Sequence, residues 1–162
     1  MEKLKLKMLN QIIKTLESEI KTSETGLDTA ETESRFHKGA MQSRYDTWKE
    51  ESQYLAGAYG KTLVELREKL SSLNVLKNKP PAIEHGGVYA VIKLEDMDTG
   101  DRSIYFLLPA GGGTEFEDSG KTIKVVSLGA PISNALIGKH EDDEVRIKIG
   151  NSVRNFIIIS IE

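Results

Sequence analysis

The chain of 162 residues has no cysteine, one tryptophan and no long apolar run. Without cysteine there is neither a disulfide framework nor a thiolate metal site. No apolar stretch approaches the roughly 18 residues that span a bilayer, and no apolar signal core follows the N-terminal lysines. The net charge of -3 lacks the strong basic excess that is typical of a generic nucleic-acid binder. These absences predict a soluble, cytoplasmic protein with no membrane contact.

The first half of the chain has a helical period. Apolar residues recur every three or four positions in two stripes, from Leu6 to Ala30 and from Met41 to Leu73. This spacing is typical of a two-stranded coiled coil. Antiparallel pairing of the stripes sets Ile20 opposite Tyr59 and puts the reversal near Gly39, because glycine tolerates the positive φ of a tight turn. We therefore predict a helical hairpin over residues 1–76 with its tip near residues 36–41.

The predicted tip is basic. Residues 34–45 contain no aspartate or glutamate, whereas Arg35, Lys38 and Arg44 carry positive charge and His37 lies between them. A long hairpin holds its tip far from the rest of the protein. The side chains of this segment should therefore decide what the hairpin does.

The second half of the chain has the periods of strands. Asn78-Lys79-Pro80-Pro81 ends the second helix, since proline lacks the N–H that a helix interior needs. Strands are predicted over residues 88–94, 103–108, 122–128, 144–149 and 154–161, and a short helix over 133–138, with Ser133 as its N-cap and Gly138 as its end. We expect an α+β protein, in which a linker at 77–86 leads to a domain at 87–162 built as a small antiparallel sheet with one short helix.

The stretch from Ile123 to Val145 resembles the C-terminal domain of the bacterial Gre (GreA/GreB) transcription elongation factors, an FKBP-like domain. The family pattern is a strand, Ser-Pro, a short Arg-Ala-Leu-hydrophobic-Gly-Lys helix and Gly-Asp-Glu-Val. The matching residues are Pro131, Ala135, Leu136, Ile137, Gly138, Lys139, Asp143, Glu144 and Val145. Ala130 replaces the family's serine and Asn134 its arginine. The helical hairpin and the linker also fit the family layout.

The resemblance implies a mode of action. Such factors dock their globular domain at the rim of the RNA polymerase secondary channel, and their coiled coil reaches the catalytic centre. In the cleaving members an Asp and a Glu three residues later, at the tip, help to hold the second Mg²⁺ and position the water that cleaves backtracked RNA. This chemistry requires carboxylates, because Mg²⁺ prefers oxygen ligands and the attacking water needs a base.

The chain departs from the family at the tip, and is interpreted as a divergent member without the acidic pair. One alignment of the second helix rests on Tyr45, Lys49, Glu50, Tyr54 and Gly57. It places the family's Asp and Glu on Lys38 and Met41, whereas an alignment from Leu70 places them on Gln42 and Tyr45. Neither register supplies a carboxylate.

The leading hypothesis is therefore a monomeric, non-enzymatic regulator without metal or cofactor that occupies the secondary channel of RNA polymerase and regulates elongation without strong transcript cleavage. The candidate channel-facing residues, placed to meet the RNA 3′ end or the active-site carboxylates, are Arg35, His37, Lys38, Met41, Gln42 and Arg44. The candidate residues for docking at the channel rim are Gly129, Ala130, Pro131, Ile132, Ser133 and Asn134.

Two alternatives remain open. A cleavage factor could use Asp28 and Glu31, which have the Asp-x-x-Glu spacing but lie about ten residues, roughly 15 Å, short of the predicted turn. A coiled-coil adaptor or chaperone-like protein would have the same helical hairpin with no polymerase partner.

Overall fold

The computed structural model describes residues 1–36, 44–150 and 152–162. It divides into two compact units, one of Met1–Asn10 with Ser72–Glu162 and one of Gln11–Ser71. The predicted boundaries at residues 76 and 87 stay a prediction.

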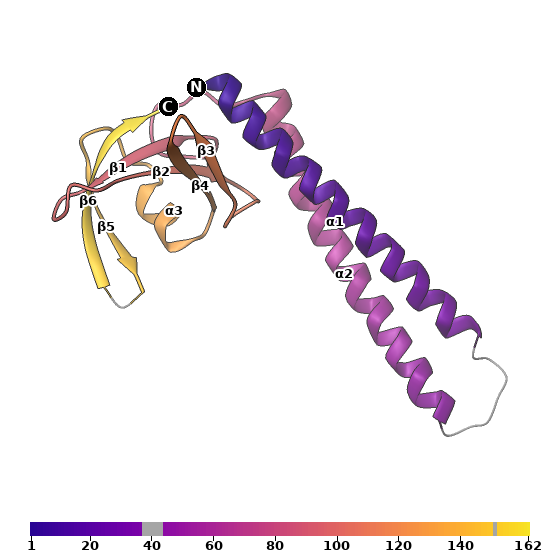
Figure 1. Cartoon of the computed structure of the whole chain (residues 1–162). Coiled ribbons are helices and arrows are strands. Elements are labelled where there is room, and N and C mark those ends of the chain that lie inside the picture. The colour runs from indigo at the N-terminus through magenta and orange to yellow at the C-terminus, as the bar shows by residue number, and fades with distance from the viewer. Residues whose placement is uncertain (37–43, 151) are drawn as a thin grey trace. The chain divides into compact units, whose positions relative to one another are not determined.

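Two helices of 35 residues each, α1 (Glu2–Phe36) and α2 (Arg44–Asn78), run side by side (Figure 1). Within Gln11–Ser71 their buried apolar residues include Ile13 and Leu16 from α1 and Leu63 and Leu66 from α2. The predicted pair of long helices is thereby confirmed, and α2 ends two residues before Pro80. None of the helices in the described residues is both long and apolar enough to cross a membrane.

The predicted register of the two helices is wrong. The ring of Tyr59 lies against Gly26, so that a Cβ added to Gly26 would be 2.6 Å from Cζ of Tyr59. Tyr59 therefore does not face Ile20, six residues earlier on α1. The stripes do not distinguish these registers, because the seam contains several small residues. A large ring opposite a glycine is the feature that selects the observed pairing.

The remaining elements form a six-stranded sheet with one short helix, α3 (Pro131–Leu136). The strand order is β3-β4-β2-β1-β6-β5. The strand bounds are β1 Val91–Asp96, β2 Arg102–Leu108, β3 Glu115–Asp118, β4 Lys121–Ser127, β5 Glu144–Ile149 and β6 Ser152–Ile161. The predicted α+β class with one short helix is confirmed.

The sheet is mixed rather than purely antiparallel, because β2 and β4 pair in parallel. The sequence prediction missed β3, a strand of four residues that is mostly exposed and contains only Phe116 as an apolar residue. Chain reversal between β3 and β4 at Ser119 and Gly120, both at positive φ, brings β4 beside β2 in the parallel direction (Figure 1).

The core of this unit lies between the sheet and α3. Leu136 of α3 is fully buried against a cluster that includes Ile92, Leu94, Leu107 and Ile158. The alternation of buried residues in β1 follows from the period of two in a strand. This packing holds α3, and the loop before it, on the sheet.

The first turn of α1 belongs to the same unit. Lys5 is 1% exposed, with its Nζ 4.9 Å from the ring centre of Tyr89 and 3.2 Å from Oε1 of Glu2. The Tyr89 hydroxyl donates a hydrogen bond to Glu2, and burial is the main cause that raises the pKa of Tyr89. The aromatic ring and the carboxylate together compensate for the hydration that the buried ammonium group loses.

Candidate functional site

The candidate docking loop, Gly129–Asn134, connects β4 to α3. Gly129 has a φ of 91°, a conformation that favours glycine. The N–H of Ala130 donates to the carbonyl oxygen of Ser127 at 3.1 Å, which closes a tight turn before Pro131 begins the helix. Proline suits the first helical position because no intrahelical partner is lost there. The loop is therefore held by its own backbone.

Ser133 fastens the docking loop from inside. Its side chain is fully buried, and Oγ donates to the carbonyl oxygen of Ser127 at 2.7 Å. The predicted N-cap role of Ser133 is wrong, because the N-cap is Ala130 and no side chain caps the helix. Pro131 starts α3 two residues before Ser133, so the serine falls within the first turn.

The six candidate docking residues separate by exposure. Gly129, Pro131 and Asn134 are exposed, whereas Ala130 and Ile132 are half-buried. Ile132 packs against the core cluster, so its side chain supports the fold. Among these six, Pro131 and Asn134 present the outward side chains of α3.

Sequence reasoning missed Ile137 as a docking candidate. Its side chain is 47% exposed at the end of α3. Pro131, Asn134 and Ile137 recur at intervals of three, whereas Ser133 and Leu136 are buried. Residues three apart share a helix face. This alternation of inward and outward positions was the signal that could have identified Ile137.

Gly86 holds the C-terminal end of α3. Its N–H donates to the carbonyl oxygen of Lys139 and its carbonyl oxygen accepts from the N–H of Gly138, both at 2.7 Å. A methyl group on Gly86 would overlap the carbonyl oxygen of Leu136. The close approach of the two backbones requires glycine at this position.

Gly86→Ala is expected to destabilise the protein by about 2–4 kcal/mol, because the overlap involves backbone atoms that cannot turn aside. Urea unfolding followed by circular dichroism measures the change. Gly87→Ala is the matched control, since its Cβ would meet no atom closer than 3.8 Å. Equal stability of the two variants would contradict the requirement for glycine at position 86.

Of the six candidate tip residues, the structure describes Arg35 and the backbone of Arg44. Arg35 is exposed, and its Nη2 lies 3.5 Å from Oε2 of Glu31. Arg44 begins α2. His37, Lys38, Met41 and Gln42, together with the Arg44 side chain, lie outside the described residues.

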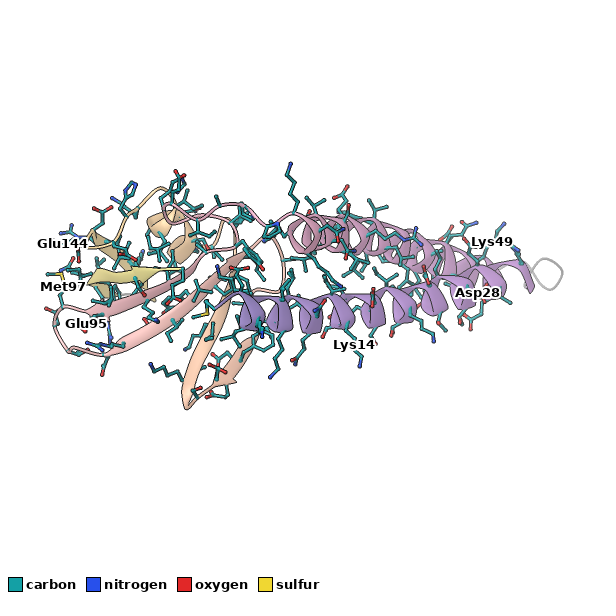
Figure 2. All side chains as sticks on the ribbon, turned by 90° about the horizontal axis from the view of Figure 1, so that it is seen from above. Lys14, Asp28, Lys49, Glu95, Met97 and Glu144 are labelled. Carbon is teal, nitrogen blue, oxygen red and sulfur yellow. The ribbon has the colours of Figure 1, made fainter. Side chains whose placement is uncertain are left out.

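The alternative pair of acids, Asp28 and Glu31, lies on the last three turns of α1. Both side chains are exposed (Asp28 is labelled in Figure 2), and Glu31 already pairs with Arg35. Phe36, the last residue of α1, is eight residues beyond Asp28, a rise of about 12 Å. Within the described ranges, no group of three or more metal-ligating side chains could hold an ion.

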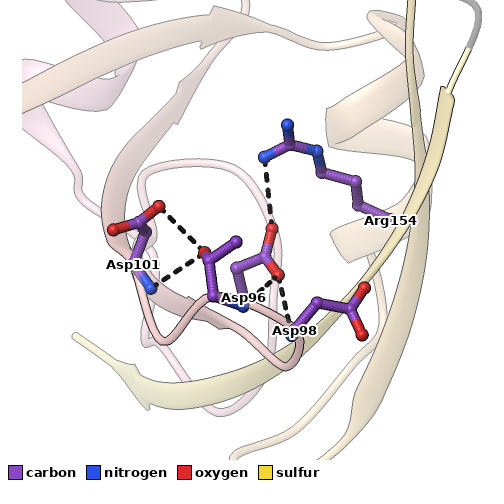
Figure 3. A network of polar contacts seen from close by, with 5 residues as sticks. Asp96, Asp98, Asp101 and Arg154 are labelled. Atoms are coloured by element: carbon purple, nitrogen blue, oxygen red, sulfur yellow. Dashed lines mark hydrogen bonds and ion pairs between the residues drawn. The ribbon is translucent and has the colours of Figure 1, made fainter.

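Asp96 organises the loop between β1 and β2 (Figure 3). Oδ1 accepts hydrogen bonds from the backbone N–H of Asp98 at 2.9 Å and of Thr99 at 3.2 Å, and Oδ2 lies 3.4 Å from Nη1 of Arg154. The Asp98 N–H is the main cause that lowers the pKa of Asp96, with Thr99 and Arg154 acting in the same direction and burial opposing them. These contacts give Asp96 a structural role, which is to hold the loop between β1 and β2 in its turn.

Asp96→Asn is expected to weaken the acid dependence of stability. A carboxyl whose pKa is lowered in the folded state stabilises the fold above its ordinary value of about 4, and the contribution is lost as the pH falls through the lowered pKa. The variant loses this charge-dependent contribution, so its unfolding free energy should fall less steeply below about pH 4 than that of the wild type. Urea unfolding between neutral and acidic pH measures both curves, and parallel curves would contradict the assignment.

Comparisons with known proteins identify the family of the globular domain. The family model "Transcription elongation factor, GreA/GreB, C-term" matches residues 87–162. Transcription elongation factor GreA of Syntrophus aciditrophicus (strain SB) is 32% identical over 119 residues, which cover 74% of this chain and 68% of that protein. GreA of Streptococcus pyogenes serotype M5 (strain Manfredo) is 28% identical over 120 residues, which cover 74% of this chain and 69% of that protein.

A solved structure, that of GreA factor homolog 1 (Gfh1) of Thermus thermophilus, is 18% identical, covers 93% of this chain and 94% of that chain, and has a TM-score of 0.40. The relatives and the family model define a class of transcription elongation factors. The chain belongs to the GreA/GreB family.

Proposed function

We propose that this protein binds bacterial RNA polymerase at its secondary channel and regulates elongation without strong stimulation of transcript cleavage. The observation that carries this proposal is the absence of aspartate and glutamate between Ser34 and Tyr45. Stabilising a second Mg²⁺ and activating a water molecule require oxygen ligands and a base. A tip with no carboxylate supplies neither.

The positive charge of the tip supports binding within the channel. Polymerase active sites contain carboxylates and RNA phosphates, and arginine and lysine pair with both. Arg35 is 77% exposed and its pair with Glu31 is a surface pair. Such pairs contribute only about 0–1 kcal/mol, so Arg35 can exchange Glu31 for another anion at little cost.

The outward face of α3 supports docking at the rim of the channel. Pro131, Asn134 and Ile137 form an exposed patch, which we name the α3 patch. Ser133 and Gly86 hold this patch from beneath through short hydrogen bonds. A surface held in one conformation loses little entropy when it binds.

Cleavage through Asp28 and Glu31 is less well supported, because two further turns of α1 separate Asp28 from Phe36. Exposing both carboxylates at the tip would require the helix to end earlier than Phe36.

Two measurements test the proposal. Affinity capture of core RNA polymerase by the full chain should succeed, and backtracked elongation complexes incubated with the protein should keep their RNA 3′ ends. Failure of capture would favour the adaptor hypothesis. Cleavage as fast as that given by a GreA factor would favour the hypothesis of unconventional acids.

A further inference from the structure

A groove of about 650 Å³ lies on the sheet of the globular unit and is lined by residues of β1, β2, β4 and β6 and by Gly120. The parallel pairing of β2 with β4 begins at Ile104 and Ile123, so Arg102, Ser103 and residues 120–122 have no partner in that ladder. A register shift occurs between Lys93 and Leu94, where β1 pairs with β6. Lys93, which lines the groove, lies beside this irregularity.

The lining of the groove is strongly basic. It contains Lys93, Arg102, Lys121 and Lys124, and no carboxylate. Three of these cations pair with glutamates outside the lining: Lys93 with Glu162 at 2.7 Å, Arg102 with Glu95 at 2.8 Å and Lys124 with Glu115 at 3.5 Å. Lys121 is exposed and makes no ion pair with any residue that the structure describes. The groove thus brings four cations together in a chain that is acidic overall, and Lys121 is the one of the four without an ion pair among the described residues.

Two buried hydroxyl groups at the groove are unsatisfied. Oγ of Ser103 and Oγ of Ser160 are inaccessible to water and have no hydrogen-bond partner among the described residues. Both serines line the groove, one from β2 and the other from β6. Leaving such a group unpaired costs about 1–3 kcal/mol, so its presence calls for a partner. An acceptor oxygen of a ligand in the groove is a suitable one after a small side-chain rotation.

The size and the mixed character of the lining define the ligand. Pockets for small molecules span about 300–1,000 Å³ and combine apolar walls with a few polar groups. Ile104 and Ile159 supply apolar wall beside the four cations. We propose that this groove binds a phosphorylated small molecule of mononucleotide size, with its phosphates on Arg102 and Lys121 and its planar or apolar part against Ile104 and Ile159.

The pairing of Arg102 with Glu95 makes the proposal directional. Arg102 is 74% exposed, so the pair is a surface pair that a phosphate can replace. Glu95, labelled in Figure 2, competes with a phosphate for the guanidinium group. Removing its charge should therefore strengthen binding, whereas removing either cation should weaken it.

Isothermal titration calorimetry of the full chain with ATP, inorganic pyrophosphate and adenosine tests the proposal without polymerase. Saturable binding of ATP and pyrophosphate is expected, with ATP tighter and adenosine weakest. Lys121→Gln and Arg102→Gln should each weaken ATP binding about tenfold, and Glu95→Gln should tighten it about threefold. Lys148→Gln, an exposed lysine on β5 outside the groove, should leave it unchanged.

Ser103→Ala separates a binding role from a structural one. Removing an unsatisfied hydroxyl should leave thermal stability equal or higher, and it should weaken ATP binding severalfold. The proposal is overturned by an absence of saturable binding, by equal losses in Lys148→Gln and Lys121→Gln, or by single-stranded RNA that displaces ATP at lower concentration than pyrophosphate does. Because no polymerase is present in this experiment, a failure of the groove to bind ATP would not bear on the proposed function.

Discussion

Placing an aspartate and a glutamate three residues apart in the tip is expected to convert this protein into a transcript-cleavage factor. Five double variants put Asp-x-x-Glu at successive registers, beginning with Lys38→Asp/Met41→Glu and ending with Gln42→Asp/Tyr45→Glu. At least one should raise the rate of RNA cleavage in backtracked complexes by about 10²-fold or more, the scale of a positioned acid–base group. The frame is already that of a GreA/GreB factor, so only the missing carboxylates need to be supplied.

Matched amides provide the control for this gain. Asn-x-x-Gln at the same positions has nearly the same shape but neither a base nor an anionic metal ligand, so these variants should stay inactive. If all five acidic variants bind polymerase and none cleaves, the missing pair is not what separates this protein from the cleaving members.

Adding negative charge to the α3 patch is expected to weaken polymerase binding strongly while the fold persists. Pro131→Glu combined with Asn134→Glu places two anions on exposed positions. A residue at the centre of an interface contributes on the order of 2 kcal/mol or more, so the pair should weaken binding by at least about 30-fold. Thermal unfolding should change little, because neither side chain is buried.

Two further variants make this result specific. Val153→Glu adds a charge at a position on β6 that is 56% exposed and should leave polymerase binding intact. Ile132→Glu should instead lower stability, because Ile132 packs against the core cluster. Unaltered binding by the Pro131/Asn134 variant would show that the α3 patch does not contact polymerase.

Helical and strand periods were sufficient to predict the two long helices and most of the strands. The two apolar stripes predicted α1 and α2, and the alternation of Glu144–Ile149 predicted β5 with the observed bounds. The motif around Pro131 and Gly138, which spans α3 and both of its ends, predicted the family. These features depend on residues that are close together in the sequence, so one sequence is sufficient to predict them.

Features that depend on contacts between distant residues could not be predicted in the same way. The parallel pairing of β2 with β4 follows from the hairpin at Ser119 and Gly120, and β3 is too short and exposed to show a pattern. Tyr59 selects Gly26 because a ring needs space, which the apolar stripes do not encode. Ser103 and Ser160 meet at one groove only through the pairing of β1 with both neighbouring strands.

The candidate site was predicted in outline only. Of the loop Gly129–Asn134, only Gly129, Pro131 and Asn134 are exposed, whereas Ser133 faces inward and the exposed Ile137 extends the patch. Both differences follow from the start of α3 at Pro131, two residues earlier than expected. Ser133 therefore lies in the first turn of α3 instead of at its N-cap, and Ile137 comes directly after the last helical residue, Leu136.

Competition for cleavage tests directly whether this protein occupies the secondary channel without cleaving RNA. Backtracked elongation complexes are mixed with a GreA factor at a fixed concentration, and this protein is added in increasing amounts. The account predicts that RNA cleavage falls progressively to the rate without GreA, because the basic tip occupies the channel and supplies no carboxylate. Cleavage that stays constant, or that rises with added protein, would contradict it.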